Sequence, residues 1–350
     1  MPEKYWLRES PLVGSGLAAI GIYLLYTFAL KRTEMKKLIA FTALASTLVA
    51  CGGSNSVRLT GSGATFPATF YQRVFKDYSD KTEGVLVNYQ ATGSGAGVRQ
   101  YWADTIDFGA SDDPVKDSQM KGPLTLIPIT GGAIVPAYNK PGCGLKLTQT
   151  QLVRVFNGSI SDWKDLGCEE GKITVVFRSD GSGTTAGFTN SLKAFSPEWT
   201  IGAGKSVSWQ TGVGSKGNAG VSGTIKNTPG SIGYLNYSYV KQNNFQEVEI
   251  QNKAGNYVKA SDETSAEGLS KIQLDDKLRG ADPNPVGANS YPIVSLTWIL
   301  ARPDHPKNDA LKGLFRYMLS DEAQAKAGSL GYVPLPVELR QKSLEAVDSL

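Results

Sequence analysis

The sequence predicts an α/β fold in which the sheets are largely parallel. Short apolar runs rich in β-branched residues alternate with stretches whose apolar residues recur at helical spacing. Three of the predicted strand-to-helix junctions carry turns rich in Gly, Ser and Thr, at 61–66, 93–97 and 181–184. With 350 residues, 41% of them hydrophobic, the chain can form one large domain or two ordinary ones.

The first part of the chain predicts a strand–turn–helix unit that occurs twice, followed by a third strand. These strands are expected at 57–60, 85–90 and 106–110, and the two helices end near Ser79 and Asp104. Pro67 falls in the first turn of the earlier helix, where its missing N–H removes no hydrogen bond. The sequence S-D-D-P at 111–114 closes the third strand, and its proline marks the boundary of any helix that follows.

The rest of the chain continues the alternation. Thr148-x-x-Gln151 matches a capping box and predicts a helix after it. Further strands are expected at 124–129, 133–138, 173–177, 231–235, 245–250 and 293–301. Further helices are expected at 184–195, 308–319 and 320–329.

The stretch R-S-D-G-S-G-T-T, residues 178–185, follows a predicted strand and opens a predicted helix. Its glycines allow a sharp turn, and the helix directs unpaired N–H groups at whatever lies before it. Arg178, Ser182 and Thr184 add side-chain donors, so a small oxyanion is the natural ligand. The alternative is a Gly/Ser turn with a surface arginine. Because ligands of open α/β sheets lie beyond the carboxyl ends of strands, the three junctions could converge on one anion.

Charge and composition exclude several classes of function. The formal net charge of +4 comes mostly from residues 1–50, so the remainder is nearly neutral and nucleic acid is not the expected partner. The single histidine, His305, makes a His-based metal site or catalytic triad improbable, and no metal or cofactor is expected. Ser94 and Ser182 lie outside any G-x-S-x-G elbow, so an enzyme such as a phosphatase or serine hydrolase is the weaker alternative.

The first fifty residues have the pattern of targeting sequence. From Met35 the chain has a basic start, an apolar run at 38–50, and then Cys51, which together predict a signal peptide at 35–50. L-V-A-C resembles a bacterial lipobox, which implies lipidation of Cys51, a tether at 51–56 and a membrane anchor. The alternative is a plain secretory signal with a free cysteine. Residues 1–34 are an upstream extension that precedes the true initiator, Met35, or else an extra membrane segment built on the apolar run at 12–30.

Two other cysteines, Cys143 and Cys168, lie 25 residues apart in turn-like contexts that contain glycine. In an exported protein they could form one disulfide; the alternative is two separate buried thiols.

Several ordered motifs carry a resemblance to a known family. They are G-S-G-A-T-F-P, V-N-Y-Q-A-T-G-S-G-A-G, D-F-G-A-S-D, R-S-D-G-S-G-T and G-S-K-G-N-A-G. Together they closely resemble the phosphate-specific substrate-binding proteins of bacterial ABC transporters. The resemblance implies a periplasmic-binding-protein type II-like fold, with two α/β domains joined by crossing hinge strands that close on one dehydrated phosphate. The domains would comprise 57–132 with 290–350, and 133–289.

The resemblance also implies a set of phosphate ligands. They are the hydroxyls of Thr65, Ser94, Ser182 and Thr184, the backbone N–H groups of Phe66 and Gly183, the guanidinium of Arg178, and the carboxylate of Asp112 as acceptor. Asp180 is expected to hold the guanidinium of Arg178 in place. The chain departs from the family at Gly95, where a second serine is common, and at Asp113, which is expected to face solvent.

Asp112 has the role of selecting the anion in this scheme. Phosphate near neutral pH still carries a proton that a buried carboxylate can accept, whereas sulfate would leave that carboxylate unpaired and repelled. Taken alone, Asp112 is equally typical of a helix N-cap beside a proline. Two nucleotide-type motifs, at 212–217 and 204–206, lack the residues that nucleotide binding requires and are predicted to be loops.

The expected protein is therefore a monomeric, lipid-anchored phosphate receptor outside a bacterial cytoplasmic membrane, which delivers phosphate to ABC permease subunits. The alternatives are a receptor for sulfate, arsenate or molybdate, an enzyme, or a surface adhesin or phosphate sensor without a transport role.

The signal-peptide hypothesis predicts the mature N-terminus. Mass spectrometry of the protein purified from its own membrane should find lipidated Cys51 as the first residue. A peptide that contains residues before Met35 would contradict the assignment of Met35 as initiator.

Overall fold

The computed structural model describes residues 56–350. The predicted extension at 1–34, the signal peptide at 35–50, Cys51 and all of the tether except Ser56 lie outside the described residues. Within the described range, no helix has both the length and the apolar content needed to cross a bilayer.

A mixed sheet runs through the described residues in the order β2-β1-β3-β12-β4-β8-β6-β7, with β9 paired to β4. The strands are β1 (Val57–Gly63), β2 (Val85–Gln90), β3 (Phe108–Ser111), β4 (Thr125–Asn139), β6 (Thr174–Arg178), β7 (Val213–Ser215), β8 (Ser231–Asn236), β9 (Gln246–Glu247) and β12 (Val294–Ala301). A small second sheet contains β5 (Lys146–Leu147), β10 (Glu249–Gln251) and β11 (Tyr257–Val258).

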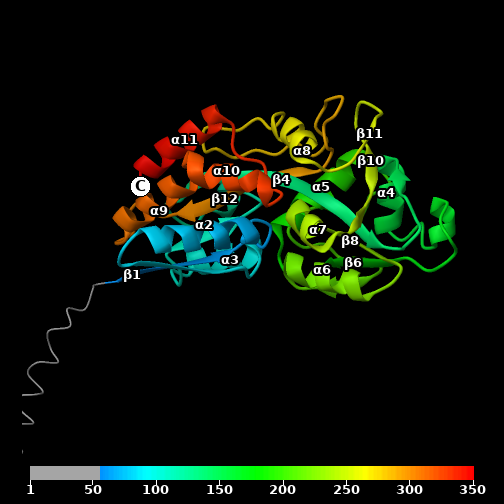
Figure 1. The fold of residues 1–350 in the computed structure, drawn as a ribbon, viewed down its shortest axis with the longest axis horizontal. Helices are drawn as coiled ribbons and strands as arrows, with labels where there is room; N and C mark the ends of the chain where they lie inside the picture. The colour runs from blue at the N-terminus through cyan, green and yellow to red at the C-terminus, as the bar shows by residue number, and fades with distance from the viewer. Residues whose placement is uncertain (1–55) are drawn as a thin grey trace, which may run out of the picture. The chain divides into compact units, whose positions relative to one another are not determined.

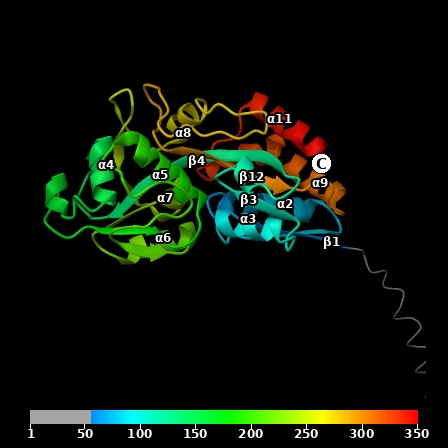
Figure 2. The same ribbon diagram turned by 180° about the vertical axis from the view of Figure 1, so that it is seen from behind.

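Strand pairing is parallel toward both ends of the large sheet and antiparallel in its middle. β1 is parallel to β2 and β3, and β6 is parallel to β7 and β8, whereas β4 is antiparallel to β12 and β8. Helices cover these strands (Figures 1 and 2), so the α/β class predicted from the sequence is confirmed. The sheet is mixed, however, and not largely parallel as predicted, because β12 and β4 run antiparallel to their neighbours in its middle.

The two strands predicted at 124–129 and 133–138 are one continuous strand, β4, so that prediction was wrong. Gly131 and Gly132, between them, look like a turn in the sequence but remain extended in the sheet. A Cβ atom at Gly131 would lie 2.7 Å from the side chain of Leu269, so glycine is required here for close packing. β4 pairs with β12 through Ala133 and with β8 from Ile134, and it thereby connects the two halves of the sheet (Figure 1).

Ten α-helices occur in the described residues: α2 (Ala68–Lys81), α3 (Ser94–Trp102), α4 (Gln149–Phe156), α5 (Gly183–Phe195), α6 (Gly217–Asn227), α7 (Tyr237–Asn243), α8 (Asp262–Leu269), α9 (Asn308–Met318), α10 (Asp321–Ser329) and α11 (Val337–Asp348). The capping box of Thr148 and Gln151 is present at α4. After Pro114 only a short 3-10 helix forms, at Asp117–Gln119.

The motif at 212–217 is not a loop, so that prediction was also wrong. It forms β7 and the first residue of α6, with Gly217 at a φ of +70°. It therefore makes a fourth strand-to-helix junction. The segment 204–206 does lie in an irregular loop, as predicted.

For description we call residues 57–132 and 290–350 lobe 1, and residues 133–289 lobe 2. Aromatic side chains fill each lobe, with Tyr71, Phe75 and Phe108 in lobe 1 and the stacked rings of Phe188 and Tyr234 in lobe 2. The assignment of the two lobes to two domains that close on a ligand stays a prediction. A disulfide joins Cys143 and Cys168 in lobe 2, with Cα atoms 5.4 Å apart, a distance typical of the bond.

Candidate functional site

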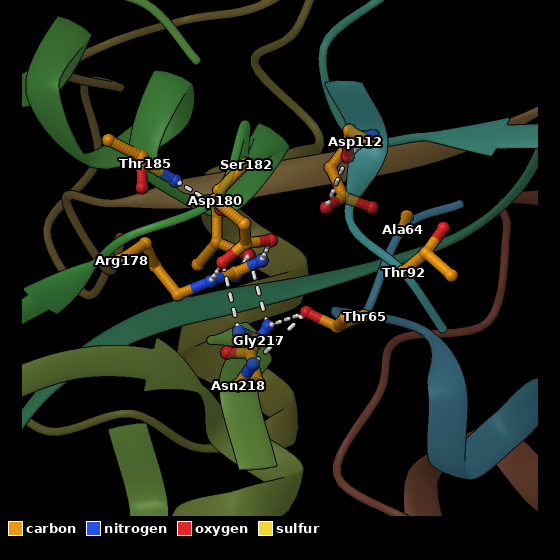
Figure 3. Close-up of polar contacts among 12 residues, drawn as sticks. Ala64, Thr65, Thr92, Asp112, Arg178, Asp180, Ser182, Thr185, Gly217 and Asn218 are labelled. Atoms are coloured by element: carbon orange, nitrogen blue, oxygen red, sulfur yellow. Dashed lines mark hydrogen bonds and ion pairs between the residues drawn. The ribbon is translucent and has the colours of Figure 1, made fainter. Parts of the chain in front are cut away.

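Four strand-to-helix junctions meet where the two lobes face each other. Lobe 1 contributes Thr65 after β1, Ser94 at the start of α3, and Asp112 after β3. Lobe 2 contributes Arg178 at the end of β6, with the turn into α5, and the start of α6 after β7. In Figure 3, Thr65 and Asp112 face the Arg178 region from the opposite side. The side chains of this set are buried.

Glycine residues allow the two lobes to come close together, because they have no side chain at the contact. A Cβ atom at Gly183 would lie 2.6 Å from Cβ of Asp112 and 2.7 Å from Oγ of Ser94. The N–H of Gly95 donates to the carbonyl of Gly181 at 2.8 Å. A Cβ atom at Gly95 would lie 3.1 Å from Cα of Gly181. A serine at position 95, the residue common in the family, would therefore require Gly181 to move by a few tenths of an ångström.

Asp180 holds the guanidinium of Arg178 in a bidentate pair. Nε of Arg178 donates to Oδ1 at 2.7 Å and Nη2 donates to Oδ2 at 2.6 Å. The N–H of Gly217 also donates to Oδ1, at 2.9 Å. Burial alone would raise the pKa of Asp180, but the hydrogen bonds and charge of Arg178 and the Gly217 N–H lower it overall. The pair fixes the plane of the guanidinium, whose Nη1 atom lies 3.5 Å from Oγ1 of Thr184.

Asp112 is the buried carboxyl group on the lobe 1 side. Oγ1 of Thr297 donates to Oδ1 at 2.8 Å, and Oγ of Ser94 lies 3.4 Å from Oδ2. Burial raises the pKa of Asp112 to about 7, although the Thr297 hydrogen bond and the charge of Arg178 act against the increase. Near neutral pH the carboxyl group can therefore exist in a form that accepts hydrogen bonds and in a protonated form that also donates one.

Asn218, at the start of α6, is a buried residue that the sequence did not single out. Its Nδ2 donates across the lobes to Oγ1 of Thr65 at 2.8 Å, and within lobe 2 to Oγ1 of Thr184 at 3.2 Å. Its Oδ1 accepts from the N–H of Asn236 at 2.9 Å. Because the amide donates to both hydroxyls, their own hydrogen atoms are free to point at a ligand. The available signal was the motif G-S-K-G-N-A-G, which contains this residue.

The remaining donors come from backbone and caps. Gly183 and Thr184 belong to the first turn of α5. The N–H groups in the first turn of an α-helix have no acceptor within the helix, so they can bind a ligand. Oγ of Ser182 accepts from the N–H of Thr185 at 3.0 Å, so its own hydrogen is available for donation. Phe66 is held by a hydrogen bond from the Tyr332 hydroxyl to its carbonyl, at 2.8 Å. The arrangement is suited to binding a small, dehydrated oxyanion.

One surface expectation needs correction. Asp113 was expected to face solvent, but its Oδ2 lies 2.6 Å from Nζ of Lys205 and its side chain is 22% exposed. The single histidine, His305, is largely buried, with Nε2 3.3 Å from Oδ1 of Asp107. Within residues 56–350, no group of three or more His, Cys, Asp or Glu side chains is placed to hold a metal ion.

A separate cavity of about 540 Å³ lies on another side of Asp112. Its lining includes Arg279 but also Asp117, Asp275 and Asp282. This excess of carboxylates makes the cavity a poor site for an anion.

Comparisons with known proteins assign the chain to a family. The model of the PBP superfamily domain matches residues 50–322, so the chain belongs to that superfamily. The phosphate-binding protein PstS of Pasteurella multocida (strain Pm70) is 39% identical over 303 residues, which cover 81% of this chain and 88% of that protein. PstS of Haemophilus influenzae is 38% identical over 301 residues, which cover 80% and 90%. Within the superfamily, the chain is a member of the PstS family.

Solved structures show the same fold. A high-affinity periplasmic phosphate-binding protein, PfluDING, bound with phosphate, has a TM-score of 0.68 at 21% identity, covering 82% of this chain and 92% of that one. The family resemblance and the periplasmic-binding-protein fold expected from the sequence are therefore confirmed.

The network around Asn218 predicts a loss of stability on truncation. Asn218→Ala leaves the buried Asn236 N–H and two buried hydroxyls without this partner, so the free energy of unfolding should fall by roughly 2 to 4 kcal/mol. Asn227→Ala, on the exposed end of the same helix, is the control and should change it by less than about 0.5 kcal/mol. Urea denaturation measures both. Equal stability of the two variants would contradict the structural role given to Asn218.

Proposed function

We propose that the chain binds inorganic phosphate outside the cytoplasmic membrane, without catalysis, and delivers it to the subunits of an ABC permease. The observation that carries the proposal is the placement of one buried carboxyl group, Asp112, and one buried guanidinium, Arg178, among buried hydroxyl and N–H donors. The PstS relatives are named phosphate-binding proteins, which supports phosphate as the ligand. We assign phosphate contacts to the residues implied by the family resemblance, Thr65, Phe66, Ser94, Asp112, Arg178, Ser182, Gly183 and Thr184.

Because Arg178 is paired with Asp180, uncharged hydrogen-bond donors should supply most of the attraction for the anion. Arg178 is neutralised in part by Asp180, with which it forms its two shortest hydrogen bonds. The rest of the attraction comes from hydroxyls, backbone N–H groups and the N-terminus of α5. The backbone N–H groups among these donors keep a fixed direction, so they select for the geometry of the anion as well as for its charge.

Asp112 distinguishes phosphate from sulfate in this scheme. As a carboxylate it accepts the proton of phosphate, whereas sulfate has no proton to offer and is repelled. Sulfate can then bind only the protein whose Asp112 is protonated. Because the pKa of Asp112 is about 7, that form is depleted as the pH rises above neutrality.

The proposal also covers closure of the lobes, the lipid anchor and the oligomeric state. We propose that lobes 1 and 2 are domains that close on phosphate, that Cys51 carries a lipid anchor, and that the protein acts as a monomer. Closure would complete the site, because donors from both lobes are needed to surround the anion.

Calorimetric titration over a range from about pH 6 to about pH 9 tests the anion selectivity. In the purified protein, sulfate affinity should fall about tenfold per pH unit above neutrality, and phosphate should bind about a hundredfold or more tightly than sulfate at the alkaline end. Asp112→Asn should bind sulfate with little pH dependence, because its amide is neutral and can donate. Asp165→Asn, at an exposed position, is the matched control.

Two results would count against the proposal. Equal affinity of the unaltered protein for phosphate and sulfate at alkaline pH would remove the role of Asp112. Unchanged phosphate affinity in Arg178→Ala would mean that the anion binds elsewhere.

A further inference from the structure

We propose that Lys205 and Asp113 form an electrostatic latch across the edge of the phosphate site, made when the lobes are closed, and that this latch slows phosphate release. The proposal rests on the proposed function, in which phosphate is bound between two lobes that open and close. It assigns a role to two residues that are not among the expected phosphate ligands.

The geometry places the pair between the lobes. Lys205 lies in lobe 2, in the loop between α5 and β7, and Asp113 follows β3 in lobe 1. Nζ of Lys205 lies 2.6 Å from Oδ2 of Asp113, and the two side chains are 18% and 22% exposed. Asp112 and Arg178, by comparison, are buried. The ion pair is therefore more exposed than these two charged groups of the proposed phosphate site.

Each partner is attached to a ligand-binding element by its backbone. The N–H of Ser182, which caps α5, donates to the carbonyl of Lys205 at 2.9 Å. Asp113 directly follows Asp112, and its N–H and carbonyl both bond to the hydroxyl of Ser111, at 3.2 Å and 2.6 Å. Each of these hydrogen bonds lies within one lobe. Separation of the lobes therefore breaks the ion pair but leaves the hydrogen bonds that position Lys205 and Asp113 intact.

The charges explain why the two residues belong together. Asp113 alone would place a second negative charge beside Asp112 and close to a bound anion, which would oppose binding. Lys205 compensates that charge and adds a charged contact to the uncharged bond between Gly95 and Gly181. Loss of Lys205 should therefore weaken binding more than loss of Asp113.

A surface ion pair within one rigid element adds little to the stability of the fold. The pair of Lys205 and Asp113 instead links the two lobes, and in the proposed function their separation releases phosphate. Any interaction present only in the closed form shifts the equilibrium between open and closed forms by its full free energy. For a partly exposed pair, that corresponds to about a two- to fivefold change in affinity. The change should appear mainly in the rate of dissociation.

A double-mutant cycle with Lys205→Gln, Asp113→Asn and the double variant tests the latch, with inorganic phosphate as the probe. Lys205→Gln should release phosphate about two- to fivefold faster than the unaltered protein at low salt, and the difference should shrink at high salt. The double variant should be no worse than Lys205→Gln, because the interaction has already been lost. Stopped-flow dissociation and calorimetry give the rates and affinities.

The matched control is an ion pair of similar geometry inside lobe 1. Nζ of Lys326 lies 2.6 Å from Oδ2 of Asp77, with side chains 25% and 16% exposed. Lys326→Gln and Asp77→Asn should leave phosphate release unchanged. Additive effects in the cycle, or dissociation at the unaltered rate in Lys205→Gln, would overturn the latch alone. If the unaltered protein bound no phosphate, the proposed function would fail, and the latch with it.

Discussion

The close approach of two strand-to-helix junctions, one from each lobe, is the constraint on which the rest of the site depends. At Gly183 and Gly95 the lobes are near enough that an added Cβ atom would crowd the opposite lobe. This approach brings Asp112 and Ser94 to the N-terminus of α5, and Thr65 to Asn218. Without it, each lobe would present only half of the donors, and the anion would remain partly hydrated.

The electrostatics of the site follow from burial. The bidentate pair keeps Asp180 ionised and Arg178 oriented, while burial raises the pKa of Asp112 toward neutrality. A carboxyl group in this condition can share a proton with its ligand, which a permanently ionised surface aspartate would not do. Lys205 pairs with Asp113, so the negative charge of Asp113 beside Asp112 is compensated.

Much of the fold could be predicted because short stretches of sequence determine where strands, turns and helices begin and end. The junctions at 61–66, 93–97 and 181–184 carry glycines and hydroxyl residues whose turn-forming role is visible without tertiary structure. β4 was misread because Gly131 and Gly132 serve close packing, with no change of chain direction. α6 escaped prediction because Gly220 and Gly223 weaken its helical pattern, and tertiary contacts override that preference.

The site residues that the sequence did not single out depend on contacts between distant parts of the chain. Asn218 bonds to Thr65, which lies 153 residues earlier, and Lys205 pairs with Asp113 across the lobes. The motif G-S-K-G-N-A-G marks Asn218 but does not show which residue it contacts, and no local pattern marks the contact of Lys205 with Asp113. The residues alone indicated an anion-binding turn with donors from Arg178, Ser182 and Thr184, and three junctions that could converge on one anion, whereas the full ligand set came from the family resemblance.

A crystal structure of the protein with phosphate tests the central claim most directly. The account predicts one phosphate between the lobes, with one oxygen accepting from the guanidinium of Arg178 and another within about 2.5 to 2.8 Å of a carboxyl oxygen of Asp112. Phosphate bound only at another position, such as the cavity beside Arg279, would contradict it.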